Sequence, residues 1–388
     1  MSAGTTVIRG GRLIDPSQGV DEHRDLVVRD GVTSDAAAND GAEEFDASGL
    51  IVVPGLVDIH CHFFYGVTSM AVDPRTAFYA TGTTVAVDAG TSGAANFINL
   101  RSFIMEPSDL HLYAFLNIYV LGMGAGPGDS FRHVKDVDVL DMAKVDSAAK
   151  LAKKHNDRIV GLKLLAPHDG RPFLHHTAEL LARTREAAEL SGTRVMCHID
   201  GGSPLTTILE PLQAGDIVTH AFHSKDPNIL DDGRLRPEVV AARDRGVVFD
   251  FAPADHHHFS WRVLEAAAAE GFWPDTISAD IANPVRGEDP FAGMTDCMSM
   301  LLHIGMPMNE VVSAASTRAA QAIGRGDMHG SLAPGRAADV TVLELIDSPK
   351  TYRSMNGEER MVTQRLVPVA TMIGGRWLWR RDRDEASA

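Results

Sequence analysis

The sequence is poor in cysteine, in basic residues and in long uncharged runs, and each shortage excludes a class of protein. Three cysteines in 388 residues cannot form the disulfide framework of a secreted scaffold, so we expect a reducing compartment, the cytoplasm. Lysine and arginine number 36 against 52 acidic residues, which gives a formal net charge of -16. Such a chain is a poor partner for nucleic acid or for an anionic membrane, and we expect a small-molecule substrate.

No stretch resembles a targeting signal or a membrane span. The first residues lack the basic flank and the apolar core of a secretory signal. Residues 110–126 form the longest uncharged apolar stretch, which is short for a bilayer crossing and predicts a buried strand with its exit loop. The hydrophobic fraction of 44% is typical of a globular protein with a full core. A homo-oligomer is compatible with this composition, which does not fix the oligomeric state.

Strands alternate with helices through the middle of the chain. Eight strand signals lie at residues 56–62, 83–88, 110–119, 159–164, 194–198, 216–220, 246–251 and 276–280. Segments such as 174–190, 237–245 and 263–271 have the apolar spacing of helices. This α/β pattern predicts a closed (β/α)8 TIM barrel over residues 55–334. The alternative, an open doubly wound sheet, would need a glycine-rich loop after its first strand, and residues 60–64 do not form one.

Both ends of the chain have a different pattern, of short strands and tight turns. Strand signals lie at residues 6–9, 25–29 and 50–53, and again at 338–343 and 369–373. We therefore expect residues 1–54 and 335–388 to form one small β-sandwich domain from both termini.

Six polar residues that suit a metal lie at or near the ends of five predicted strands: His60 and His62, Lys163, His198, His220 and Asp280. The ends of barrel strands face one mouth, where active sites lie. His60 and His62 are two residues apart on a strand, so both side chains point the same way. Any one of the histidines alone would more often be a hydrogen-bonded core residue, and Asp280 alone a helix cap. Their joint occurrence at equivalent positions predicts a metal centre.

Lys163 lies in an apolar strand, between Leu162 and Leu164. Burying its ammonium group would cost several kcal/mol unless the amine is neutral or paired. A neutral lysine can react with carbon dioxide to form a carbamate, whose two oxygens can bridge two cations.

The motifs together resemble the amidohydrolase superfamily, in its binuclear, lysine-bridged branch. The resemblance covers nearly the whole chain: residues 54–58, the His60-Cys61-His62 motif, Lys163, the two later histidines, Asp280, and residues 332–340. Residues 87–93, 114–118 and 216–220 look most like the dihydroorotase-like proteins described as amidohydrolase/deacetylase metallohydrolases.

The resemblance implies a site with two divalent metal ions, zinc by default, with manganese, iron or cobalt as substitutes. His60 and His62 would bind one ion together with Asp280, His198 and His220 would bind the other, and N6-carboxylated Lys163 would bridge them. A metal-bridging hydroxide would then attack a carbonyl, with Asp280 acting as general base and afterwards as general acid.

Two features narrow the substrate that the resemblance implies. Dihydroorotases carry an arginine two residues beyond the second histidine, where this chain has Phe64, and the deaminases of the superfamily lack the bridging lysine that Lys163 would supply. The favoured function is deacylation of an N-acyl amino acid or an O-acyl hydroxy acid. A cyclic amidase of the hydantoinase or dihydroorotase kind is the alternative, and a non-catalytic amidohydrolase-like binding protein is a second one.

Candidate substrate contacts follow several of the strands: Tyr65, His223, His257 and Arg286. Arg286 could bind a substrate carboxylate through its guanidinium group. The triplet His256-His257-His258 either contacts the substrate or forms a surface loop, and the sequence leaves both interpretations open. It also leaves open the acyl group, the stereochemistry and the native metal.

Overall fold

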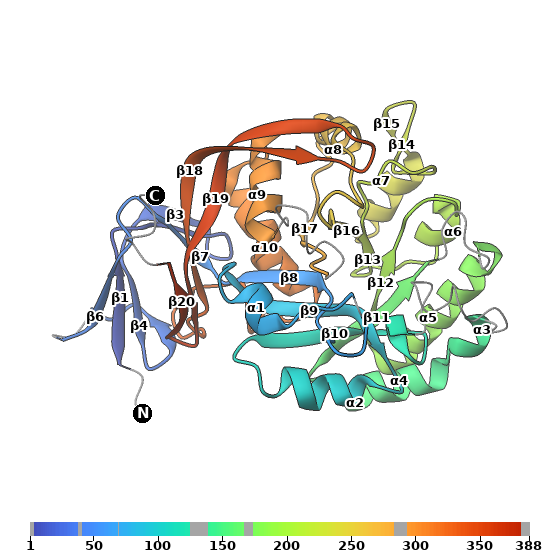
Figure 1. Cartoon of the computed structure of the whole chain (residues 1–388), viewed down its shortest axis with the longest axis horizontal. Helices are drawn as coiled ribbons and strands as arrows, with labels where there is room; N and C mark the ends of the chain where they lie inside the picture. Colours follow the sequence, from blue (N-terminus) through green and yellow to red (C-terminus); the bar gives the residue numbers. More distant parts are fainter. Residues whose placement is uncertain are drawn as a thin grey trace.

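The middle of the chain forms a closed barrel of eight parallel strands (Figure 1). The computed structural model describes residues 4–37, 41–68, 70–124, 139–166, 174–282 and 293–381. Its barrel strands, in spatial order, are β8 (Leu56–Cys61), β9 (Thr83–Gly93), β10 (His111–Asn117), β11 (Ile159–Leu165), β12 (Arg194–His198), β13 (Ile217–Thr219), β16 (Val248–Phe251) and β17 (Thr276–Ile277). Backbone hydrogen bonds between residues 60–62 and 280–281 join the first strand to the segment after the last. The predicted barrel is confirmed, since each predicted strand segment coincides with one of these strands.

Helices surround the barrel (Figure 1). They are α1 (Pro74–Phe78), α2 (Phe97–Leu100), α3 (Val139–Met142), α4 (Val145–Lys154), α5 (Thr177–Ser191), α6 (Leu205–Leu209), α7 (Pro237–Asp244), α8 (Trp261–Ala269), α9 (Met294–His303), α10 (Met308–Ala315) and α11 (Thr317–Ala322). Local sequence signals set their ends: the Ser260 side chain caps α8 by accepting a hydrogen bond from Val263 N, and α5 ends at Gly192, with a φ of 70°. Within the described ranges no helix is long and apolar enough to cross a bilayer.

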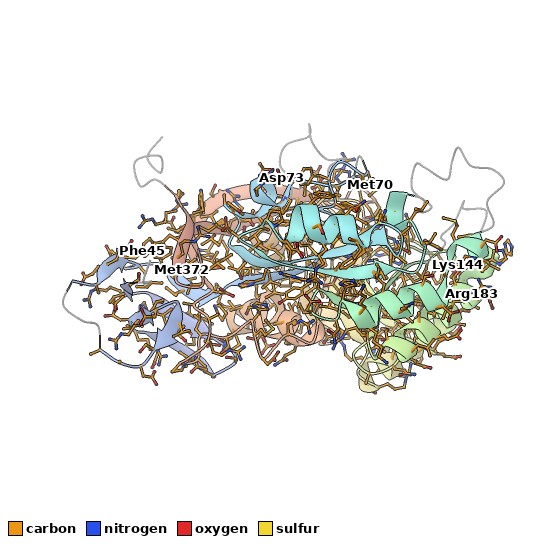
Figure 2. All side chains as sticks on the ribbon, turned by 90° about the horizontal axis from the view of Figure 1, so that it is seen from below. Phe45, Met70, Asp73, Lys144, Arg183 and Met372 are labelled. Carbon is orange, nitrogen blue, oxygen red and sulfur yellow. The ribbon has the colours of Figure 1, made fainter. Side chains whose placement is uncertain are left out.

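Strands from both termini form two sheets beside the barrel. One sheet contains β5 (Val32–Ser34), β4 (Leu26–Arg29), β1 (Thr5–Arg9) and β6 (Glu43–Asp46); the other contains β20 (Arg376–Arg380), β19 (Glu359–Ile373), β18 (Val340–Arg353), β7 (Ile51–Pro54), β2 (Arg12–Asp15) and β3 (Val20–His23). Buried apolar side chains such as Ile8, Val52 and Met372 form their common core. Figure 2 shows Phe45 and Met372 at this end of the molecule, with Lys144 and Arg183 at the other end.

The hairpin of β18 and β19 is much longer than the sequence predicted. Its strands have 14 and 15 residues, and their outer halves leave the β sheets and run across the barrel (Figure 1). Trp261 donates a hydrogen bond to the carbonyl of Tyr352 at 3.0 Å, and Ser299 Oγ accepts one from Leu366 N at 2.9 Å. The segment Asp347-Ser348-Pro349 has the composition of a turn, so the sequence pattern did not predict the outer half of β18.

Candidate metal centre

The six predicted ligand residues converge at the mouth of the barrel, and all six side chains are buried. The Asp280 carboxylate lies at the centre of the group. Its Oδ1 atom is 3.1 Å from His62 Nε2 and 3.5 Å from His60 Nε2, and its Oδ2 atom is 3.6 Å from His220 Nε2. One carboxylate therefore faces three imidazoles from two other strand ends.

His60 is held by a hydrogen-bonded relay that also fixes its protonation. Its Nδ1 atom lies 2.7 Å from the Thr219 hydroxyl, which donates its own hydrogen to Asp250 Oδ2 at 2.9 Å. Because a hydroxyl has one hydrogen to give, Thr219 must accept from the Nδ1–H of His60. The Nε2 atom of His60 is then the unprotonated nitrogen, and it lies 3.5 Å from Asp280 Oδ1.

Asp250, the carboxylate at the base of this relay, is fully buried. Burial raises its pKa to about 6, against hydrogen bonds from Ser278, Thr276 and Thr219 that favour the charged form. The carboxylate is thus ionised at neutral pH and favours the donor orientation of Thr219.

A second relay of the same composition holds His62. Its Nδ1 atom lies 2.9 Å from the Thr91 hydroxyl, and that hydroxyl also hydrogen-bonds to the buried Asp88. Burial raises the pKa of Asp88, while the neighbouring His62 ring and hydrogen bonds from Phe63 N and Thr91 oppose that rise. The Thr91 hydroxyl thus orients the His62 ring, whose Nε2 atom faces Asp280 Oδ1 at 3.1 Å.

His220 and Asp280 share an unusual backbone conformation at the ends of their strands. Their φ angles are 62° and 52°, in the left-handed region that favours glycine. His220 Nδ1 lies 2.7 Å from the carbonyl of Ala252, which can only accept, so its Nε2 atom is also unprotonated. Backbone strain of this kind gathers at functional sites, where it aims a side chain.

These side chains fit a cation better than they fit one another. Three imidazole Nε2 atoms converge on one carboxylate within 3.6 Å, and a positive charge among them stabilises this arrangement. Among the described residues, His220 Nε2 and Asp280 Oδ1 are buried without a hydrogen-bond partner. Oxygen and imidazole donors of this kind suit a divalent transition metal.

Lys163 lies at the floor of the group. Its Nζ atom is 3.3 Å from His60 Nε2 and 3.4 Å from Met196 Sδ, and burial lowers its pKa to about 8. Gly90 packs against its aliphatic stem, since a Cβ atom at residue 90 would lie 2.7 Å from Lys163 Cγ. The amine is therefore held in place and is partly neutral near pH 8.

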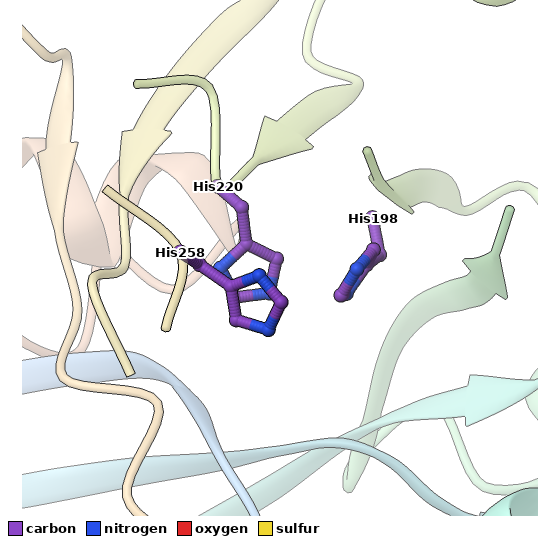
Figure 3. Close-up of side chains that lie close together, drawn as sticks. All are labelled: His198, His220 and His258. Atoms are coloured by element: carbon purple, nitrogen blue, oxygen red, sulfur yellow. The ribbon is translucent and has the colours of Figure 1, made fainter. Parts of the chain in front are cut away.

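His198, His220 and His258 form a second group, in which their ligand atoms lie within 4.8 Å of one another (Figure 3). The ring centroids of His198 and His220 are 4.3 Å apart, and those of His220 and His258 are 4.2 Å apart. Burial holds the pKa of His198 and of His220 well below the ordinary value, so both rings are neutral at pH 7. His258 thus joins the two histidines that the sequence predicted for the second ion.

His258 is positioned from behind by Asp200. Its Nδ1 atom lies 3.4 Å from Asp200 Oδ1, and Lys225 Nζ lies 2.5 Å from the other oxygen of that carboxylate. Burial alone would raise the pKa of Asp200, but His258 and Lys225 lower it to about 2. A carboxylate behind a histidine is a common device for orienting a metal ligand.

The predicted substrate-contact residues differ in burial and in their hydrogen-bond partners. Tyr65 is half-buried and accepts a hydrogen bond from Arg75, and His223 is buried with its Nδ1 atom accepting from Lys225 N. His257 is exposed and packs on His256, so it is not the histidine of its triplet that joins the centre. Arg286 lies outside the described residues.

The sequence analysis did not identify the residues that orient the ligands: Asp88, Thr91, Asp200, Thr219 and Asp250. Two of them, Asp88 and Asp250, were indicated by the sequence, because an aspartate within an apolar barrel strand costs free energy to bury without a partner. The threonines carried none, since a β-branched residue is ordinary in a strand.

Comparisons with known proteins agree with this geometry. The chain matches the amidohydrolase family over residues 51–378. It is 32% identical to a deacetylase of Agrobacterium fabrum, over 86% of this chain and 80% of that one, and 30% identical to a deacetylase of Brucella anthropi, over 91% and 88%. A crystal structure of a dihydroorotase superposes with a TM-score of 0.82 at 26% identity, over 96% of this chain and 98% of that one. The predicted resemblance is confirmed: the chain belongs to the amidohydrolase family and is a metal-dependent hydrolase.

Proposed function

We propose that this protein deacylates a small substrate, an N-acyl amino acid or an O-acyl hydroxy acid, with two divalent metal ions. The observation that carries the proposal is the convergence of unprotonated imidazole nitrogens on the Asp280 carboxylate beside a buried, partly neutral lysine. The deacetylases among the relatives support the acyl substrate.

Two groups of side chains would hold the ions, most favourably Zn²⁺. His60, His62 and Asp280 would bind one of them, and His198 and His220 would bind the other, with His258 as an additional ligand. When bound, such a pair lowers the pKa of water and polarises the carbonyl of the substrate. A reducing compartment such as the cytoplasm suits the three buried, unpaired cysteines.

Lys163 would bridge the two groups as its N6-carboxylated form. Burial already favours the neutral amine, which is the form that reacts with carbon dioxide. The carbamate would introduce a negative charge beside His60.

Asp280 would hold and transfer the proton of the reaction. Its carboxylate borders both groups, through Oδ1 on the side of His62 and through Oδ2 on the side of His220. It would accept a proton during attack and deliver that proton to the leaving amine or alcohol.

A cyclic amidase remains the second candidate, because a dihydroorotase structure and dihydroorotase relatives match this chain. Phe64 is buried at the position where dihydroorotases would carry a carboxylate-binding arginine, and this weighs against ring opening of an acidic pyrimidine.

The test is a screen of the metal-loaded protein against N-acyl-D- and N-acyl-L-amino acids, acylated hydroxy acids and cyclic amides, with Asp280→Asn assayed beside it. We expect the acylated compounds to be hydrolysed, and we expect the variant to keep much of the metal while losing most of the turnover. Hydrolysis of cyclic amides alone would favour the second candidate. An unchanged rate in the variant would remove Asp280 as the proton carrier.

A further inference from the structure

A third group of metal-ligand side chains lies at the opposite end of the barrel, away from the metal centre. His111 begins β10, His329 lies in the segment between α11 and β18, and Asp339 directly precedes β18. Their ligand atoms lie within 4.8 Å of one another. Residues from a barrel strand, a connecting segment and the terminal sheets thus meet at one point.

Asp339 is the shared partner of both histidines. Its Oδ2 atom is 3.0 Å from His111 Nε2 and 3.4 Å from His329 Nδ1, and its Oδ1 atom accepts a hydrogen bond from Gly374 N at 3.0 Å. Burial would raise the pKa of Asp339, but the two histidines hold it below its ordinary value. The carboxylate is therefore charged at neutral pH.

Neither histidine makes a short, well-aligned hydrogen bond with this carboxylate: the contact from His329 Nδ1 is 3.4 Å long, and that from His111 Nε2 is poorly aligned. His111 Nε2 is a buried atom that lacks a hydrogen bond of acceptable geometry among the described residues, despite its 3.0 Å distance from Asp339. His329 Nε2 lies 2.9 Å from the Tyr113 hydroxyl; if it donates there, the Nδ1 atom faces Asp339 with a lone pair. A hydrogen-bond partner on the far nitrogen of a histidine fixes the orientation of its ring, as in metal ligands.

We propose that His111, His329 and Asp339 bind a divalent transition-metal cation, Zn²⁺ by their chemistry, at a structural site separate from the metal centre. Two imidazoles and a carboxylate are a typical zinc donor set, and water can complete the coordination. The His111 side chain is 33% exposed, so the group lies close to the protein surface although its ligand atom is buried. The bound ion would join β10 to β18, and thereby join the barrel to the sheets formed by the termini.

One opposing charge limits the affinity of this site. Burial lowers the pKa of His329 and the positive charge of Arg336 lowers it further, so that charge also acts against a bound cation. Its guanidinium group is directed at backbone carbonyls, including that of Gly326 at 2.8 Å. We therefore expect weaker binding here than at the metal centre.

The experiment is a measurement of bound Zn²⁺ per chain after metal removal and equilibrium dialysis against Zn²⁺, for the full-length protein, His111→Ala and the control His23→Ala. His23 is an exposed histidine on β3, so its variant corrects for adventitious binding to surface imidazoles. We expect His111→Ala to bind one ion fewer than the wild-type protein and His23→Ala to match the wild type. Far-UV circular dichroism checks that each variant is folded, and His111→Gln, which keeps the length of the side chain, replaces His111→Ala if that variant is not.

Equal stoichiometry in the wild-type protein and the folded His111 variant would overturn the inference. The result is independent of the proposed function, because it depends on a difference of one ion. A failure of the metal centre would lower the count in every protein and leave that difference intact.

Discussion

The hydroxyl of Thr219 provides the sharpest test of the relay that orients His60. Thr219→Val keeps the shape of the side chain and removes two contacts, the 2.9 Å bond to Asp250 and the 2.7 Å contact with His60 Nδ1. The Nδ1–H of His60 then lies in a buried site without its acceptor, which costs about 1–3 kcal/mol. The ring can also rotate or change tautomer, which would turn its lone pair away from Asp280.

The expected loss of metal affinity follows from the role of such partners. Removing a group that orients a metal ligand lowers affinity by about 10–100-fold. That range corresponds to about 1.4–2.7 kcal/mol of binding free energy. The assay is a competition titration of Zn²⁺ between the protein and a chromogenic chelator at fixed pH, with thermal unfolding of the metal-free protein measured in parallel.

Thr276→Val is the matched control. Its hydroxyl donates to the other oxygen of Asp250 at 2.7 Å, and Thr276 is as fully buried as Thr219, but among the described residues it has no hydrogen bond to a histidine. Both variants should therefore lower the stability of the metal-free protein and raise the pKa of Asp250. Only Thr219→Val should strongly lower the affinity for metal. An affinity within about twofold of wild type in Thr219→Val would refute the orienting role. Equal losses in both variants would show that the charge of Asp250, and not the orientation of the ring, controls the metal.

Three further predictions concern the same region. Lys163→Ala should lose bound metal and catalytic activity together, and a short carboxylic acid in solution should partly restore both. Wild-type metal content and a wild-type rate of hydrolysis in this variant would contradict the bridging role. Gly90→Ala should destabilise the protein by about 1–3 kcal/mol in urea unfolding and displace Lys163, because the φ angle of Gly90 is 94° and a Cβ atom would lie 2.7 Å from Lys163 Cγ. Gly215→Ala is the control: Gly215 has a φ angle of 85° and open space around it, so this variant should show the cost of the backbone strain alone. Burial lowers the pKa of His223 to about 4, so its neutral form contributes stability above pH 6.5 that is lost as the pH falls toward 4. His223→Gln should reduce the pH dependence of the urea unfolding midpoint between pH 6.5 and pH 4. An unchanged pH dependence would exclude this residue as the cause.

The barrel, and the convergence of six polar residues at its mouth, could be predicted because both depend on rules that act along the sequence. Strand alternation sends His60 and His62 to one face, and the structure directs both rings at Asp280. Parallel strands place their C-terminal ends at one mouth, so Lys163 and His198 could be assigned to the same site before any contact was known.

The relays could not be predicted, because they depend on the register between strands. Thr219 pairs with His198 across β12 and β13, and its side chain still reaches His60, three strands further round the barrel. The choice among the three adjacent histidines depends on loop geometry. Ala254 and Asp255 have φ angles of 48° and 61°, and this turn places His258 against His220 while His257 stays exposed.

The relays also explain how a buried group of histidines stays ready to bind metal. Burial holds the pKa of His60 far below its ordinary value, so protons compete weakly for its Nε2 atom at neutral pH. The hydroxyl of Thr219 fixes which nitrogen is free, and Asp250, with its pKa of about 6, keeps that hydroxyl a donor. Without a cation, the lone pairs that the relays aim at Asp280 repel one another, so binding of a metal should relieve that repulsion and stabilise the fold in the same step. A centre of this kind would be preorganised for a cation, at the expense of the stability of the metal-free chain.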